Sequence, residues 1–171
     1  MPRPHPRPWP PCARRSRRVA DTVRLGIDWG KARIGVAAAN AGTSFAYPVG
    51  TVQAGPDELR GLAAIVAEYE PGAIYVGLPL TLSGERALAA EYVLARAAAL
   101  AEAVAPVGVR LVDERMSTVS ASRSLGSAGR RAKQQRQVID QAAAVEILQR
   151  ALDVEERSGA LAGDPAPREE L

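Results

Sequence analysis

Residues 23–38 read VRLGIDWGKARIGVAA, and this stretch decides the fold. Two short apolar runs, at residues 23–28 and 34–38, flank the sequence WGKAR, whose glycine suits the turn of a β-hairpin. A third strand is predicted over residues 47–52. Because consecutive strands with short links usually pair antiparallel, we expect these three strands to form an antiparallel unit.

Helices and strands alternate in the rest of the folded part. The predicted helices cover residues 56–69, 85–104, 117–125 and 138–153, and the predicted strands cover 73–76 and 109–112. The buried face expected of the second helix consists of Leu88, Tyr92, Ala95 and Ala99. The order βββαβαβαα predicts an α/β fold with a mixed five-stranded sheet and helices on both faces.

Both ends of the chain have the composition of disordered tails. Residues 1–18 hold six arginines, six prolines and no acid, and proline blocks regular secondary structure. We expect this tail to run over residues 1–21, and a second one over residues 158–171, which read SGALAGDPAPREEL. A single folded domain over residues 22–157 is therefore predicted.

Charge is distributed unevenly along the chain. The net charge is +3, but acids outnumber basic residues once the six arginines of the N-terminal tail are set aside. A basic segment without acids lies between Glu114 and Asp140. Its cations are Arg115, Arg123, Arg130, Arg131, Lys133 and Arg136. This local concentration, rather than the overall charge, indicates an anionic partner.

Composition excludes several kinds of site. The only histidine and the only cysteine, His5 and Cys12, lie in the N-terminal tail, so a Ser-His-Asp triad, a Cys-His dyad and a Cys/His zinc site are excluded from the folded part. No run of eighteen apolar residues and no signal-peptide pattern occurs, so a cytoplasmic protein that does not enter a membrane is expected. Hydrolysis would depend on carboxylates, alone or through a hard cation such as Mg²⁺ or Mn²⁺.

Three acids stand out by their positions. Asp28 ends an apolar strand, Glu114 follows another, and Asp140 lies early in the last helix. Each also has a simpler interpretation: a turn-capping acid, a solvated strand-end acid, and a first-turn acid that interacts with the helix dipole. Asp113 and Glu114 point to opposite faces of their strand, so at most one of the two turns toward Asp28. Composition alone does not unite the three acids in one site.

Four motifs follow one another along the chain: LGIDWGKARIGVA at 25–37, GLPL at 77–80, DERMST at 113–118, and a stretch from AK at 132–133 to IDQAAA at 139–144. Together they resemble the motifs of the YqgF (RuvC-like) family, with Asp28, Gly30, Arg33 and Gly35 in matching places. There are two departures. Trp29 stands where a small aliphatic residue is expected, and Ala32 stands where lysine is common.

The resemblance implies an RNase H-like fold and a metal-dependent endonuclease. It implies that Asp28, Glu114 and Asp140 are the catalytic residues and bind Mg²⁺ or Mn²⁺. The implied substrate is structured RNA, the precursor of 16S rRNA at its 5′ end during ribosome biogenesis, or else branched DNA, on which the protein would be a Holliday junction resolvase. Ribosomal particles are among the expected partners, and the protein would act as a monomer or a homodimer.

The basic residues are expected to hold a nucleic-acid backbone. Arg33, Arg115 and the predicted loop with Arg130, Arg131, Lys133 and Arg136 can contact phosphates, or else form a solvated charged surface. Aromatic residues make up only 4% of the chain, which argues against base stacking as the main mode of binding. Trp29 can stack on a base or pack in the core, and packing is the simpler interpretation.

Two other functions fit parts of the sequence. A nucleic-acid-binding or ribosome-associated module would retain the basic segment but would not cleave RNA. An actin-like ATPase or a sugar kinase also begins with an Asp-x-Gly strand near phosphate, but such proteins need two domains of this kind and the chain supplies one.

Overall fold

The computed structural model describes residues 21–79, 85–113 and 132–168. Three strands come first: β1 (Arg24–Trp29), β2 (Arg33–Ala39) and β3 (Tyr47–Gln53). Then follow α1 (Glu58–Tyr69), β4 (Ala73–Leu78), α2 (Glu85–Ala103), β5 (Gly108–Asp113), α3 (Ala132–Ser158) and β6 (Asp164–Pro165). The predicted strands, and the helices predicted over 56–69 and 85–104, are found within two residues of their expected ends. The helix predicted over 117–125 lies outside the described residues.

The strands form one mixed sheet in the order β3-β2-β1-β4-β5-β6. β1 pairs antiparallel with β2, and β2 pairs antiparallel with β3. β1 pairs parallel with β4, and β4 pairs parallel with β5. The predicted antiparallel unit and the predicted parallel strand–helix–strand unit are therefore confirmed, and the sheet has six strands in the described residues rather than the five expected.

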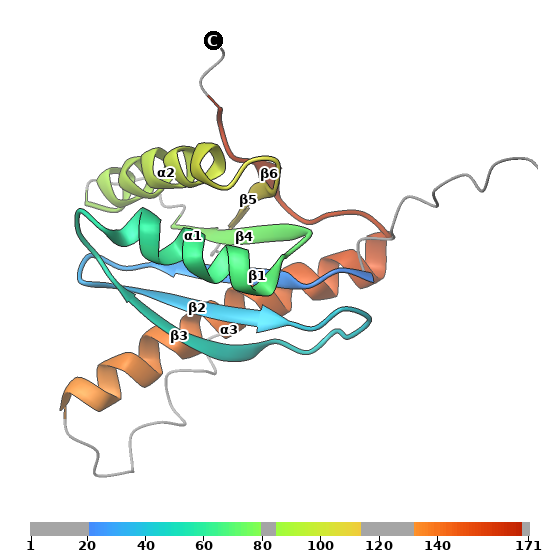
Figure 1. The fold of residues 1–171 in the computed structure, drawn as a ribbon, viewed down its shortest axis with the longest axis horizontal. Helices are drawn as coiled ribbons and strands as arrows, with labels where there is room; N and C mark the ends of the chain where they lie inside the picture. The colour runs from blue at the N-terminus through green and yellow to red at the C-terminus, as the bar shows by residue number, and fades with distance from the viewer. Residues whose placement is uncertain (1–20, 80–84, 114–131, 169–171) are drawn as a thin grey trace, which may run out of the picture.

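Helices cover both faces of the sheet, as predicted (Figure 1). Alternation along β1 assigns its residues to the two faces: Leu25, Ile27 and Trp29 pack in the cluster that α1 and α2 cover. On the other face, Ala37 and Tyr75 pack against Leu148 of α3. Gly26 and Asp28 alternate with these apolar residues along β1 and therefore lie on the α3 face.

The buried face of α2 differs from the prediction. Leu88 is 67% exposed, and Tyr92 is more exposed than the helix residues that face the sheet. The buried residues of α2 are Val93, Ala97, Leu100 and Ala101, with Val104 just beyond its end. The sheet face below them is already filled by large side chains such as Ile74 and Val76, so small side chains let the helix pack closely.

The C-terminal segment also differs from the prediction. Residues 159–168 were expected to belong to a disordered tail, but Asp164 and Pro165 form β6, an antiparallel edge strand on β5. Ala162 and Ala166 are buried, and the backbone N–H of Ala166 donates a hydrogen bond to the carbonyl oxygen of Val109. Backbone pairing with an exposed sheet edge needs no particular side chain, so composition does not reveal it.

Helix α3 begins earlier than expected. It starts at Ala132 instead of residue 138, so Lys133 and Arg136 belong to the helix and not to a loop. Its far end is fixed to the sheet by a buried ion pair, in which Arg24 Nε lies 3.3 Å from Glu155 Oε2. The hydroxyl of Tyr75 also donates a hydrogen bond to Glu155. Among the helices of the described residues, none combines the length and the apolar character needed to cross a bilayer.

Candidate active site

Asp28 occupies a half-buried position near the end of β1. It pairs with Gly35 of β2 in the antiparallel register. Directly paired residues of neighbouring strands point to the same face of a sheet, so Asp28 and Gly35 share the α3 face. Gly35 has no side chain, so the backbone of α3 can come close to the sheet beside Asp28.

Gly35 is where helix α3 comes closest to β2. A Cβ atom added to Gly35 would lie 2.1 Å from the backbone carbonyl oxygen of Asp140, a distance that no real Cβ contact shows. Gly26 allows a similar approach further along the helix, because an added Cβ would lie 2.6 Å from the Cβ of Leu148. Two glycines on one face of the sheet thus let the helix backbone pack against it and place Asp140 beside the residue that pairs with Asp28.

Asp140 forms an ion pair with Arg33, the first residue of β2. Arg33 Nε lies 3.3 Å from Asp140 Oδ2, and the two side chains are 16% and 28% exposed. Arg33 lies two residues before Gly35 and therefore on the same face of β2. With α3 beginning at Ala132, Asp140 is in the third turn of the helix, so the interpretation as a first-turn acid on the helix dipole is wrong.

The end of β5 lies at the same edge of the sheet as Asp28. Val76 of β4 pairs with Ile27 on one side and with Leu111 on the other, so the three parallel strands end together. Val109 and Leu111 pack on the α1/α2 side, and alternation gives Asp113 that side, away from Asp28. Glu114, the next residue, lies outside the described residues.

The remaining predicted site residues are placed as follows. Trp29 is 6% exposed and packs in the core under α1 and α2, so it does not stack on a nucleic-acid base. Lys133 and Arg136 lie in the first two turns of α3, on the helix that carries Asp140. Arg115, Arg130 and Arg131 lie outside the described residues.

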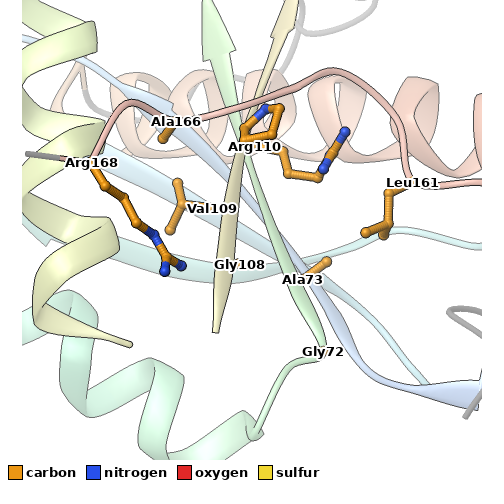
Figure 2. A pocket seen from close by; sticks show the side chains of 9 residues that line it. Gly72, Ala73, Gly108, Val109, Arg110, Leu161, Ala166 and Arg168 are labelled. Atoms are coloured by element: carbon orange, nitrogen blue, oxygen red, sulfur yellow. The ribbon is translucent and has the colours of Figure 1, made fainter. Parts of the chain in front are cut away.

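A cavity of about 310 Å³ lies at the opposite end of the sheet. It is lined by residues that begin β4 and β5, together with Leu161, Ala166 and Arg168 of the C-terminal segment (Figure 2). Asp28 is near the carboxyl end of β1, which runs parallel to β4, so this cavity and the Asp28–Asp140 site lie at opposite ends of these strands. Within the described residues, no group of three acids, histidines or cysteines is close enough to hold a metal ion.

The sequence motifs indicate Asp28 and Asp140 as site residues but do not indicate which residues bring them together. Gly26 and Gly35 both belong to the motif over residues 25–37, which does not by itself show what they contact. A glycine in a strand is a signal of close backbone approach, and two glycines at positions that face the same helix could have suggested the contact with α3. The ion pair between Arg33 and Asp140 joins residues 107 positions apart, and no sequence pattern indicates it.

Comparison with known proteins finds a matching family model and similar curated proteins. The family model described as "RuvX: Holliday junction resolvase" matches residues 22–154. A protein of Cutibacterium acnes named "Putative pre-16S rRNA nuclease" is 53% identical over 131 residues, which are 77% of this chain and 82% of that protein. Proteins of the same name from Mycobacterium tuberculosis and a Nocardioides species are 53% and 50% identical and cover 82% and 83% of this chain, and 82% and 94% of their own lengths.

Solved structures support the fold. The structure titled "T. thermophilus RuvC in complex with Holliday junction substrate" aligns with a TM-score of 0.52 and 19% sequence identity. The alignment covers 84% of this chain and 99% of that chain. At this identity the similarity establishes the architecture, a RuvC-like sheet with helices on both faces, in agreement with the RNase H-like fold expected from the sequence motifs.

Proposed function

The chain belongs to the RuvX Holliday junction resolvase family, and from this membership we propose that it is a metal-dependent endonuclease that processes the 5′ end of the precursor of 16S rRNA. It is a nuclease, a hydrolase that acts on ester bonds, as its relatives are named. Relatives about half identical to this chain carry the name of a pre-16S rRNA nuclease, and this supports RNA as the substrate.

One observation supports the active site most directly. Asp28 and Asp140 come from elements 112 positions apart, and the close approach of α3 at Gly35 places them on one face of the sheet. Acids on the same side of a sheet repel one another when they are close, unless a cation lies between or beside them. Such an arrangement suits phosphodiester hydrolysis and has little value for stability.

The donor atoms fit a hard divalent cation. Asp28 and Asp140 provide carboxylate oxygens, the ligands that Mg²⁺ and Mn²⁺ prefer. The ion pair of Arg33 with Asp140 tests this fit. The Arg33 side chain lies against Asp140, on the side of the sheet that Asp28 also faces. A positive group is thus already accommodated at this carboxylate.

Glu114 is proposed as the third ligand. It lies outside the described residues, and its place in the motif over residues 113–118 supports this choice. Asp113, by alternation along β5, faces the side of the sheet that α1 and α2 cover.

The chain's own groups would bind and orient the substrate. Asp28, Glu114 and Asp140 would hold the cation, which when bound supplies a Lewis acid that polarises the phosphoryl group and lowers the pKa of water. Asp28 is fixed by the strand pairing at Gly35, and Asp140 by the helix contact there, so neither needs to be ordered when substrate arrives. Arg33, together with Lys133 and Arg136 of α3, would contact backbone phosphates.

The decisive experiment is a cleavage assay on two labelled substrates. The full chain is incubated with an RNA that spans the 5′ leader of the 16S rRNA precursor, or with a four-way DNA junction, in Mg²⁺, Mn²⁺ or EDTA. We expect metal-dependent cleavage of the RNA, none in EDTA, and none by the Asp28→Asn protein. Binding of RNA without cleavage in any metal would contradict the proposal and favour a binding module, including one that acts on ribosomal particles.

The same assay separates a second candidate function. The family description and the architecture shared with RuvC favour a Holliday junction resolvase. Because the same carboxylates would serve either reaction, only the shape of the substrate distinguishes the two. Paired incisions in the DNA junction, with the RNA left intact, would establish the resolvase and exclude the rRNA substrate.

A further inference from the structure

The ion pair joins Arg33, which is proposed to bind a phosphate, to Asp140, which is proposed to bind a metal ion. Arg33 Nε lies 3.3 Å from Asp140 Oδ2, so while this pair is formed it competes with the two proposed functions of these side chains. Asp140 cannot give all of its negative charge to a metal ion, and Arg33 cannot turn fully to a phosphate. Binding of both ligands therefore favours opening of the pair.

The backbone of Arg33 is held firmly on its strand. A Cβ added to Gly30 would lie 2.4 Å from the carbonyl oxygen of Arg33, so the hairpin between β1 and β2 is tight at this point. The carbonyl of Ala32, one residue earlier, accepts hydrogen bonds from the side chain of Gln53 and from the backbone N–H of Ala54. Any exchange of partners by Arg33 is therefore a movement of its side chain alone.

The Arg33 side chain, in contrast, has few contacts. In the described part of the chain, Asp140 is the one partner that the Arg33 guanidinium has. The Nε–H group is buried and lacks a hydrogen-bond acceptor of good geometry there, so the contact is a close charge pair without a well-formed hydrogen bond. An arginine with five donors and one such contact retains most of its capacity for a phosphate, which matches its planar fork.

We propose that Arg33 is an exchangeable counter-ion: it neutralises Asp140 before a metal ion binds and transfers to a backbone phosphate when the metal takes its place. This inference rests on the proposed function, because it assumes that Asp140 is a metal ligand. Its consequence is that metal and nucleic acid bind cooperatively. The metal releases Arg33 for the phosphate, and by reciprocity a phosphate that engages Arg33 frees Asp140 for the metal.

The first experiment measures metal binding without nucleic acid. Mn²⁺ is titrated into the full-length protein and its Arg33→Gln and Lys31→Gln variants by isothermal calorimetry. Lys31 is the matched control, because it is an exposed cation of the same hairpin, two residues away, with no ion pair to Asp140. We expect Arg33→Gln to bind Mn²⁺ about fivefold more tightly, as the loss of a competing pair requires, and Lys31→Gln to change affinity by less than about twofold.

An equal gain in the two variants would overturn the proposal, since it would show that the hairpin acts only through its overall positive charge. Failure of the proposed function has a different signature. If the wild-type protein binds Mn²⁺ no better than an Asp28→Asn/Asp140→Asn double variant, there is no metal site at these acids and both proposals are wrong. If the double variant loses Mn²⁺ binding but Arg33→Gln binds as the wild type does, only the exchange is wrong.

The second experiment measures the cooperativity directly. Anisotropy of a labelled RNA hairpin is followed with each protein in Ca²⁺ and in EDTA, and the ratio of the two dissociation constants is the coupling. We expect Arg33→Gln to reduce this ratio by about the same fivefold factor and Lys31→Gln to leave it unchanged. If Arg33→Gln weakens RNA binding equally in Ca²⁺ and in EDTA, Arg33 is an independent phosphate contact and the exchange does not occur.

Discussion

Helix α3 is joined to the sheet by two arginine–carboxylate pairs of equal length, which differ in burial and in the other contacts of their side chains. At one end, Arg24 lies 3.3 Å from Glu155, and at the other, Arg33 lies 3.3 Å from Asp140. The side chains of the first pair are 3% and 9% exposed, whereas those of the second are 16% and 28% exposed. An arginine–carboxylate pair thus occurs at each end of the contact between α3 and the sheet. It is buried at the closed end, with Arg24 and Glu155, and partly exposed at the open end, with Arg33 and Asp140.

The surroundings differ even more than the burial. Arg24 also donates hydrogen bonds to the carbonyl oxygens of Thr22 and Thr43, at 2.6 and 2.7 Å, and Glu155 accepts one from the Tyr75 hydroxyl. Among the described residues, Asp140 is the only partner of the Arg33 side chain. The Arg24–Glu155 pair therefore belongs to a buried network of hydrogen bonds that fixes the helix, while the Arg33–Asp140 pair can open at small cost. Distance alone does not tell a structural ion pair from a functional one.

The largest effect is expected at the open end. Asp140→Asn should lower the rate of RNA cleavage by roughly 1,000-fold or more, because a metal ligand contributes several kcal/mol to the transition state. It should cost less than about 1 kcal/mol of stability, because the lost pair is partly exposed. Single-turnover cleavage and thermal melting together check this. A variant that cleaves normally would remove Asp140 from the active site.

The opposite result is expected at the closed end. Glu155→Ala leaves Arg24 buried without its carboxylate and should lower the free energy of unfolding by about 3 kcal/mol. Chemical denaturation measures this loss. Cleavage by the folded fraction should stay near that of the wild type, because Glu155 is far along α3 from Asp140. A loss of stability under about 1 kcal/mol would mean that the network does not hold the helix.

A smaller effect tests the contact that joins helix and site. Gly35→Ala would place a methyl group 2.1 Å from the carbonyl oxygen of Asp140, and because that atom is backbone, α3 must shift. We expect a loss of about 1–3 kcal/mol and weaker Mn²⁺ binding. Gly50→Ala on β3 is the matched control, since a Cβ there meets nothing within 4 Å. Equal behaviour of the two variants would show that the close approach at Gly35 has no consequence.

The smallest effect is a pH dependence at the closed end. Burial and the hydrogen bond to Glu155 raise the pKa of Tyr75 well above its ordinary value. In the unfolded chain a tyrosine ionises near pH 10, so Tyr75 contributes stability that is fully present below about pH 10 and is lost as the pH rises further. Tyr75→Phe should flatten the fall of melting temperature above pH 10, whereas Tyr92→Phe on the surface of α2 should not. An unchanged alkaline profile in Tyr75→Phe would contradict this assignment.

The sequence predicts most of the fold because local patterns carry it. The glycine between two apolar runs predicts the β1–β2 hairpin, and Pro71 with Gly72 predicts the end of α1. The errors occur where distant residues decide the structure. In the alanine-rich helix α2, Leu88 and Tyr92 predict one buried face, but the helix packs on the sheet through the neighbouring face with Val93, Ala97 and Leu100. β6 exists because β5 offers a free edge, which no feature of residues 159–168 reveals.

The candidate site is predictable in its members but not in its geometry. The family motifs indicate both Asp28 and Asp140, and Asp28 also stands out because an acid at the end of a buried strand is costly without a role. Their proximity depends on how α3 crosses the sheet, which follows from Gly26 and Gly35 meeting the helix backbone. The choice of Asp140 as the partner of Arg33 depends on the same crossing, so sequence analysis could place both residues in the site without pairing them.

The most direct test of the central claim is the location of the metal on the folded protein. Mn²⁺ broadens the NMR signals of nearby nuclei, and a titration of the isotope-labelled protein maps where it binds. If the acids on the α3 face form the active site, the amide signals of Asp28, Gly35 and Asp140 disappear first, while those of Gly72, Gly108 and Arg168 at the opposite end of the sheet persist. Preferential broadening around Gly108 and Arg168, with Asp28 and Asp140 unaffected, would contradict the account.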